Sequence, residues 1–425
     1  SGEYWLSFES PSAGIATLVG LPISMSFCDY SLGADEGKGQ NLKKIPDFLV
    51  VGAGINGLLV SRNLLALGAS VMLIDQGEVA RESSWAGGGI VSPLYPWRYS
   101  PAVTALASWA QEYYPQLVRD LLAETGVDAE FEQCGLLMLD APDQSDAVSW
   151  AVSEGKKMEV WGAGRIYEAE QNLAAGFGEG LWMPYLGHVR NPRLCKALIA
   201  SLKQSPSFGL QTHTRVTGFE KADNRIVAAY TKGAGSGESQ SMQAGAFVLT
   251  AGAWTQQLLG SLQVESGVAP VKGQMLQYRL AEPLIDSMVL HKGKYLIPRR
   301  DGYLLVGSTL EYADFDKSLT EEGRKILQDA AVGILPDLAR YEPVRQWSGL
   351  RPGRAGGLPV IGLVEPHENL FVNAGQFRNG LVLAPASARL LSELIINQRP
   401  FVDPQPYRPG TDPRESSQAI QAQAS

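Results

Sequence analysis

Short runs of apolar residues mark the first predicted elements of the chain. Residues 47–51 form one such run, which ends at Gly52-Ala53-Gly54 and is followed by a helical pattern from Asn56 to Leu67. Gly68 ends this predicted helix, and residues 70–75 are typical of a second strand. Because both strands are apolar throughout and lack alternation, we expect them to lie buried in a parallel sheet. The pattern therefore predicts a β–turn–α–β unit.

The rest of the chain mixes helical and strand patterns. Helical periodicity covers residues 103–122 and returns in a long helix from about Leu381 to Asn397. The predicted strands and hairpins are residues 135–139, 247–250 and 370–374, a hairpin over 215–231 that turns at Asp223-Asn224, and a second hairpin over 295–308 that turns at 299–302. No repeat or linker separates these segments. We therefore expect an α/β fold, α+β overall, whose domains are interwoven.

Composition excludes several classes of function. The net charge is −8 and the basic residues do not cluster, which argues against nucleic acid as a partner. No stretch approaches the roughly 18–20 apolar residues of a membrane span. The cysteines and histidines are too scattered for a disulfide framework or a metal site, so we expect reduced thiols, no metal and a cytoplasmic protein; they are Cys28, Cys134, Cys195, His188, His213, His291 and His367. Residues 1–44 and 409–425 lack periodicity and are expected to be a disordered extension and a loose tail.

The glycine turn has the spacing of a dinucleotide-binding site. In Gly52-x-Gly54-x-x-Gly57 the first glycine permits a tight turn, the second lets the backbone approach a pyrophosphate, and the third lets helix and strand pack closely. Asp75 ends the second strand, where a carboxylate can accept hydrogen bonds from a ribose. Ile55, Asn56 and Gln76 adjoin these positions and are assigned to the same site. A purely structural crossing of helix and strand is the alternative.

A hydroxyl- and glycine-rich segment, Arg81–Ile90, follows the acid and resembles a feature of the D-amino acid oxidase superfamily of flavoproteins. Four later segments narrow the resemblance to the glycine oxidase family; they are residues 270–274, 295–299, 349–353 and 375–381. The resemblance runs from about Phe48 to Gln398. It implies a Rossmann-like FAD-binding domain interwoven with a substrate domain that has a large antiparallel sheet. The expected boundaries are 45–130, 189–266 and 346–408 for the FAD-binding parts, and 131–188 and 267–345 for the substrate parts.

The resemblance also implies how FAD is held. Ser83, Ser84, Ala86, Gly88, Gly89 and Ile90 would wrap the pyrophosphate and flavin, Val216 would contact the adenine, and Ala251, Gly252 and Trp254 would lie along the cofactor. The helix that follows Asn379, Gly380 and Leu381 would stabilise negative charge on the reduced flavin. Residues 300–308 contain no cysteine. FAD is therefore expected to be bound non-covalently.

Three residues are expected to hold the substrate. Arg351 matches the family arginine that binds the carboxylate, for which a planar guanidinium is suited; a surface ion pair is the alternative. Tyr295 matches a tyrosine whose hydroxyl meets the same carboxylate, although strand tyrosines commonly serve packing. Arg378 matches a position whose backbone carbonyl takes the amine, with a purely structural loop arginine as its alternative.

Some positions depart from the family pattern. Ile90 and Leu310 stand where relatives carry methionine at the site. Trp85, Tyr95 and Trp97 are large for this neighbourhood and could be core aromatics, or could wall a small pocket and favour glycine.

The expected function is oxidation of a small amino acid, glycine foremost, with sarcosine and small D-amino acids also considered. O₂ would reoxidise the flavin, and the imine product would suit thiamine thiazole biosynthesis. The alternatives are a dehydrogenase that passes electrons to a quinone, a non-catalytic nucleotide-binding subunit, and an NAD-dependent dehydrogenase. A homo-oligomer is expected.

Overall fold

The computed structural model of the protein describes residues 45–233 and 239–411. The expected disorder of residues 1–44 and most of the expected loose tail lie outside these residues, as does Cys28. Among the helices of the described part, none is long and apolar enough to cross a membrane.

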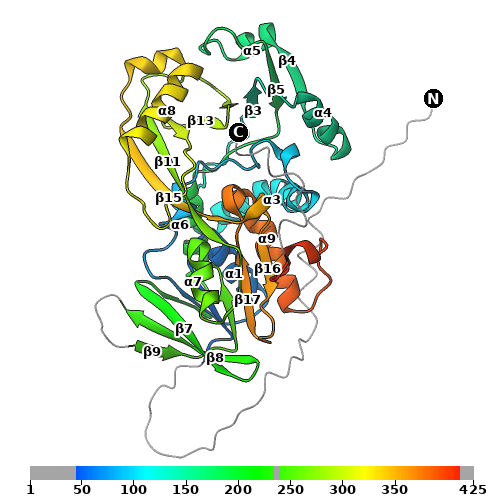
Figure 1. Cartoon of the computed structure of the whole chain (residues 1–425), viewed down its shortest axis with the longest axis vertical. Coiled ribbons are helices and arrows are strands. Elements are labelled where there is room, and N and C mark those ends of the chain that lie inside the picture. The colour runs from blue at the N-terminus through cyan, green and yellow to red at the C-terminus, as the bar shows by residue number, and fades with distance from the viewer. Residues whose placement is uncertain (1–44, 234–238, 412–425) are drawn as a thin grey trace, which may run out of the picture. The chain divides into compact units, whose positions relative to one another are not determined.

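A largely parallel sheet contains the predicted β–turn–α–β unit (Figure 1). In the described part of the chain it has six strands, in the order β16 (Val360–Leu363), β17 (Leu370–Ala374), β10 (Ala246–Leu249), β1 (Phe48–Val51), β2 (Val71–Ile74) and β6 (Phe208–Gln211). β16 alone pairs antiparallel, at one edge. All four residues of β1 are buried. The prediction of a buried parallel sheet from unbroken apolar runs is therefore confirmed.

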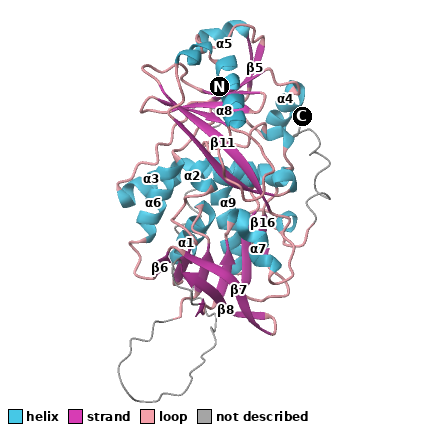
Figure 2. Ribbon diagram, turned by 60° about the vertical axis from the view of Figure 1, so that its left-hand side comes forward, coloured by secondary structure: helices cyan, strands magenta, loops and turns pink. Residues whose placement is uncertain are grey.

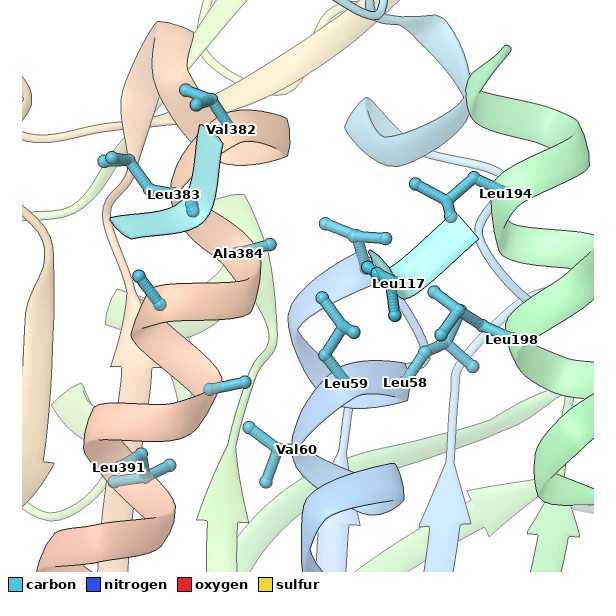
Figure 3. Close-up of a cluster of buried hydrophobic side chains, with 14 of the residues drawn as sticks. Leu58, Leu59, Val60, Leu117, Leu194, Leu198, Val382, Leu383, Ala384 and Leu391 are labelled. Carbon is cyan, nitrogen blue, oxygen red and sulfur yellow. The ribbon is translucent and has the colours of Figure 1, made fainter. Parts of the chain in front are cut away.

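Helices cover one face of this sheet. They are α1 (Ile55–Ala66), α3 (Pro101–Thr125), α6 (Asn191–Leu202) and α9 (Gly380–Ile395). Figure 3 shows their side chains meeting in one core, with Leu58 and Leu59 of α1 between Leu198 of α6 and Leu391 of α9. The other face packs against a three-stranded sheet of β7 (Thr214–Ala222), β8 (Arg225–Gly233) and β9 (Ser239–Met242), and against α7 (Thr255–Gly260).

Helix α3 is longer than the predicted 103–122 because its capping residues lie outside the apolar pattern. The Ser100 hydroxyl accepts a hydrogen bond from the N–H of Val103, and Pro101 occupies the first turn. Gly126, in the left-handed conformation (φ 68°), ends the helix.

A second, eight-stranded sheet carries the other side of the site. Its order is β15 (Arg345–Gly353), β11 (Ala269–Arg279), β14 (Tyr303–Gly307), β13 (Lys294–Pro298), β12 (Met288–His291), β3 (Leu136–Leu139), β5 (Glu179–Met183) and β4 (Glu159–Gly162). Its strands pair antiparallel except β3 and β12, which pair in parallel. Helix α8 (Glu321–Ile334) packs on one face through alternate residues such as Leu296. The intervening residues, Tyr295 and Ile297 among them, lie on the opposite face.

The two large sheets alternate along the chain. Strands of the eight-stranded sheet lie between residues 136 and 183 and again between 269 and 353, separated by strands of the parallel sheet. Figure 2 shows the long strand β11 between α8 and the helices α2 (Ser83–Ala86), α3 and α9. β15 pairs with β11 along its whole length, so the second sheet extends to Gly353, past the expected boundary at residue 345. The remaining helices, α4 (Gln144–Ser153) and α5 (Ala163–Ala169), flank β3 to β5.

Candidate active site

A cavity of about 310 Å³ lies where the two large sheets meet. One part of its wall consists of the glycine turn, the end of β2 and the first residues of β7. Another part consists of residues of β11, β13 and β15. Of the residues predicted to hold cofactor or substrate, Gly57 and Asn379 do not line it. The others do: Gly52, Gly54, Ile55, Asn56, Asp75, Gln76, Ser83, Ser84, Ala86, Gly88, Gly89, Ile90, Val216, Ala251, Gly252, Trp254, Tyr295, Arg351, Arg378, Gly380 and Leu381.

The glycine turn is built for a close approach of backbone. Gly52 has φ 107°, which side-chain-bearing residues rarely adopt. A Cβ on Gly57 would overlap the carbonyl oxygen of Gly52 and lie 2.8 Å from the Thr250 hydroxyl oxygen. Gly57 therefore lies in close packing with the turn and Thr250, and it does not line the cavity itself. Thr250 donates to the Gly52 carbonyl (2.8 Å) and was not singled out from the sequence.

Asp75 has two tasks at the end of β2. Its carboxylate accepts hydrogen bonds from the backbone N–H groups of Ala53 (2.7 Å) and Gly77 (2.8 Å), and it lines the cavity. It therefore fixes the turn that Gly52 makes possible. One N–H at the start of α1 is also already used, because Ile55 donates to the Ser84 hydroxyl (2.9 Å). Ser84 thus joins the Arg81–Ile90 segment to the glycine turn.

The cavity-lining residues 86–89 have their four carbonyl groups held by donors from distant parts of the chain. Each carbonyl accepts one hydrogen bond of 2.7–3.0 Å, and the donors are, in order, the indole of Trp347, the amide of Asn191, the guanidinium of Arg299 and the backbone N–H of Val189. The N–H groups of Gly88 and Gly89 have no protein acceptor within residues 45–233 and 239–411. The segment therefore offers free backbone N–H donors, while its carbonyl groups are hydrogen-bonded to distant parts of the chain.

Arg299 is the deeply buried member of this group. Its guanidinium donates to the carbonyls of Gly88 (2.7 Å) and Val189 (3.0 Å) and meets Nδ1 of His188 at 2.7 Å. Burial lowers the pKa of Arg299 to about 10, so it remains a cation at neutral pH. Burial and the neighbouring Arg299 lower the pKa of His188 to about 3, which leaves a neutral imidazole able to accept. Arg299 ends the 295–299 motif, and the available signal for its role was an arginine directly after a buried strand.

Arg351 is held in a fixed orientation on β15. Its Nη1 donates to the backbone carbonyls of Lys272 and Thr309, both at 3.2 Å, and its Nη2 donates to the Ser308 hydroxyl at 2.7 Å. A side chain on Gly273 would overlap the guanidinium, so the glycine makes room for it. Burial lowers the pKa of Arg351 to about 10. No carboxylate forms an ion pair with it in the described part of the chain, which removes the surface ion-pair alternative.

Tyr295 lies on the cavity face of β13. Its ring fills the space left by two glycines, since a side chain at Gly88 or Gly307 would meet it within 3 Å. The hydroxyl contacts the sulfur of Met275 at 3.3 Å, a weak acceptor, and thereby keeps the capacity to bind a ligand. Its negative form would raise the pKa of Arg351, so the two side chains are electrostatic neighbours.

Arg378 lies in the short helix Phe377–Asn379 that precedes α9, and it lines the cavity. Among the described residues, its guanidinium forms no hydrogen bond or ion pair. Gly380 and Leu381, at the start of α9, line the cavity as well. Asn379 is buried behind them, with its side-chain N–H groups unpaired.

The large aromatic residues do not wall this cavity. Trp85 packs edge-on against Trp347, and Tyr95 packs edge-on against Trp97, so the interpretation as packing residues is favoured. Leu310 is 41% exposed and does not line the cavity either, contrary to its expected place at the site. The size and polarity of these four residues are known from the sequence, but the directions in which their side chains point are not.

Cys134 is half-buried, Cys195 is buried, and both are free thiols. No cysteine of the described residues lines the cavity. Within the same residues, no group of three potential metal ligands comes together.

Comparison with known proteins gives a consistent picture. The family described as FAD dependent oxidoreductase matches residues 47–394. The chain is similar to the glycine oxidase of Pseudomonas putida, with 48% identity over 361 residues that cover 85% of this chain and 97% of the relative. It has the same identity and coverage of 85% and 98% with the glycine oxidase of Pseudomonas aeruginosa. Among solved structures it is similar to glycine oxidase from Geobacillus kaustophilus, with a TM-score of 0.78, 26% identity, and coverage of 85% and 98%.

Proposed function

The chain belongs to the family of FAD-dependent oxidoreductases, and we propose that it oxidises the amine of a small amino acid, glycine foremost, in the cavity between its two large sheets. One observation carries this proposal. The cavity that begins at the glycine turn and Asp75 ends at Arg351, an oriented cation without a carboxylate partner in the described part of the chain. A dinucleotide site and a carboxylate site therefore share one space.

The residues present fit FAD. Room for a pyrophosphate at Gly52 and Gly54 is supported by the positive φ of Gly52 and by the close packing at Gly57. Asp75 would bind the ribose, and Val216, Ala251, Gly252 and Trp254 would contact the nucleotide. The free N–H groups of Gly88 and Gly89 and the start of α9 at Gly380 would meet the flavin. Asn379 would act from behind α9, through packing.

FAD, when bound, supplies the acceptor for the hydride that leaves the substrate's α-carbon. The protein's task is then to place the substrate. Arg351 would bind the carboxylate through the N–H groups that Ser308, Lys272 and Thr309 leave free, and the Tyr295 hydroxyl would add one hydrogen bond. The backbone carbonyl of Arg378 would accept from the amine. No proton-transfer residue is needed once the amine is neutral.

Glycine is proposed as the substrate because relatives with 48% identity are glycine oxidases. The overall reaction would be glycine, O₂ and water giving glyoxylate, ammonia and hydrogen peroxide. Sarcosine and small D-amino acids would be accepted to a lesser degree. Non-covalent binding of FAD is supported by the lack of a cysteine among the described cavity residues. A homo-oligomeric state and a cytoplasmic location stay predictions from the sequence.

The test uses the purified yellow protein with glycine, sarcosine, D-alanine and D-proline under air. Peroxide from glycine at a rate equal to or above the others would support the proposal. Bleaching of the flavin under anaerobic glycine without peroxide in air would mean a dehydrogenase with another acceptor. No bleaching by any of the four amino acids would refute the proposed reaction. Flavin that stays on the denatured polypeptide would refute non-covalent binding.

A further inference from the structure

The strand β11 carries buried polar side chains on the face that turns away from the cavity. Gly273 and Met275 line the cavity. Because side chains alternate along a strand, Lys272 and Gln274 lie on the opposite face, where they are 1% and 0% exposed. The next residue of that face, Leu276, belongs to the apolar core that α8 covers. Burying polar groups is costly unless they are paired, so the partners of Lys272 and Gln274 matter.

Their common partner is Glu311, in the segment that follows β14. Its carboxylate accepts from Nζ of Lys272 (3.1 Å), from Nε2 of Gln274 (2.8 Å) and from the Thr309 hydroxyl. Its backbone also forms a bridge to Lys272, with two N–H···O hydrogen bonds of 2.9 Å. The Thr309 hydroxyl in turn accepts from the backbone N–H of Gln274 at 2.8 Å. Glu311 therefore holds residues 309–311 against β11 through its side chain and its backbone together.

The same residues supply the acceptors that orient Arg351. Its Nη1 donates to the backbone carbonyls of Lys272 and Thr309, and its Nη2 donates to the hydroxyl of Ser308, the residue before Thr309. The Lys272 carbonyl accepts from Arg351 and from the backbone N–H of Glu311. Lys272, Thr309 and Glu311 do not line the cavity themselves. Their effect on a ligand therefore has to pass through the guanidinium.

We propose that Glu311 and Lys272 are positioning residues for substrate binding, which orient the Arg351 guanidinium from behind β11. The inference rests on the proposed function, because it takes Arg351 as the group that binds the substrate carboxylate. An arginine side chain loses much rotamer freedom when it is fixed, so its orientation depends on fixed acceptors. The buried ion pair fixes them. If Glu311 moved away, the remaining ion-pair partner of Lys272 in the described part of the chain would be Asp316, at 4.0 Å.

Glu311→Gln is the direct test. The carboxylate accepts from three donors, whereas a glutamine side chain has one oxygen and an NH₂ group that would face donors. In the holoenzyme we expect the KM for glycine to rise about 10-fold, as for the loss of one charged hydrogen bond, with little change in the limiting rate of flavin reduction. Thr309→Val keeps the ion pair and removes one hydroxyl, and Lys272→Met keeps the hydroxyl and removes the pair. Both should raise the KM in the same direction by a smaller factor.

The matched control for loss of stability is Glu170→Gln. Glu170 is also a buried acid, and it accepts from the backbone N–H groups of Asp286 and Ser287, which do not contact Arg351. This variant should lower the melting temperature, as Glu311→Gln does, but leave the KM for glycine unchanged. Asp329→Asn breaks an exposed ion pair with Lys325 on α8 and should change neither quantity.

A second measurement does not depend on turnover. Acetate and its neutral analogue acetamide are titrated against each holoenzyme, and binding is followed in the visible spectrum of the flavin. The wild-type protein should bind acetate more tightly than acetamide. Glu311→Gln should need about 10-fold more acetate, while its response to acetamide stays the same. A general loss of structure would weaken both ligands alike.

The outcomes separate this inference from the proposed function. Unchanged KM and acetate affinity in Glu311→Gln, Thr309→Val and Lys272→Met, or an equal change in Glu170→Gln, would overturn the inference while activity on glycine upholds the proposed function. If Glu311→Gln does not fold, the other two variants decide. If the wild-type protein binds acetate no better than acetamide, the role of Arg351 fails and the inference fails with it. If glycine does not reduce the flavin but the variants lose acetate affinity, the proposed reaction fails and the positioning role stands.

Discussion

Replacing Arg351 with lysine tests the carboxylate site while keeping the charge. A guanidinium has five N–H donors, and three of them are used by the carbonyls of Lys272 and Thr309 and by the Ser308 hydroxyl. Two remain, on Nη2 and Nε, which is what a bidentate carboxylate contact needs. Lysine has three donors and cannot serve three protein acceptors and a carboxylate together. The substrate therefore loses at least one charged hydrogen bond.

Such a bond contributes about 1.5–3 kcal/mol, so kcat/KM for glycine should fall by about 10- to 150-fold in Arg351→Lys. Arg351→Ala removes the charge as well and should raise the KM more steeply. The assay is anaerobic flavin reduction at increasing glycine, together with the ratio of FAD to protein. The control is Arg345→Lys, an exposed position at the other end of β15, where the guanidinium stacks over Trp85 and no effect on glycine is expected. An unchanged KM in Arg351→Ala with full FAD content would refute the assignment.

Three further substitutions separate the contributions of single groups. Tyr295→Phe should cost about 1 kcal/mol, or roughly fivefold in kcat/KM, because one neutral hydrogen bond is lost; an unchanged value would leave the tyrosine a packing residue. Gly57→Ala should destabilise the turn at Gly52 by about 1–3 kcal/mol, seen as a lower melting temperature and less FAD per protein, and normal FAD content would contradict the close packing described. Arg299→Met leaves the Gly88 carbonyl unpaired and should shift both the visible spectrum and the midpoint potential of the bound flavin, with partial recovery in Arg299→Lys; unchanged values of both would show that the arginine serves folding alone.

The elements that the sequence predicted best are those whose partners are close in the chain. The unit from β1 through α1 to β2 rests on apolar runs and on glycines within 30 residues of one another, and the hairpin of β13 and β14 rests on a single turn. In both cases local pattern and tertiary structure agree. Sequence motifs identified three candidate substrate-binding residues, Arg351, Tyr295 and Arg378. The structure places all three on one cavity. Their binding roles stay predictions.

The sequence did not predict the direction in which several side chains point. A large aromatic residue has the same sequence pattern whether it lines a cavity or packs against other side chains. Only the fold shows that the second holds for Trp85, Tyr95 and Trp97. Leu310 follows β14 where the antiparallel pairing with β11 shifts by one residue, from Met275–Gly307 to Lys272–Glu311, so the alternation that fixes Tyr295 on the cavity face does not extend to it.

The segment 86–89 shows why long-range partners matter most at the site itself. It has no periodicity that would fix its conformation, and glycines permit many others. Its carbonyls are fixed by Trp347 on β15, Asn191 at the start of α6 and Arg299 at the end of β13, which lie 104 to 261 residues away in the chain. A carbonyl released from its donor could turn into the cavity and put its negative end where a backbone N–H now stands. These three side chains would therefore act on a bound flavin through the loop they hold, and the eight-stranded sheet and helix α6 together set the electrostatics of one short segment.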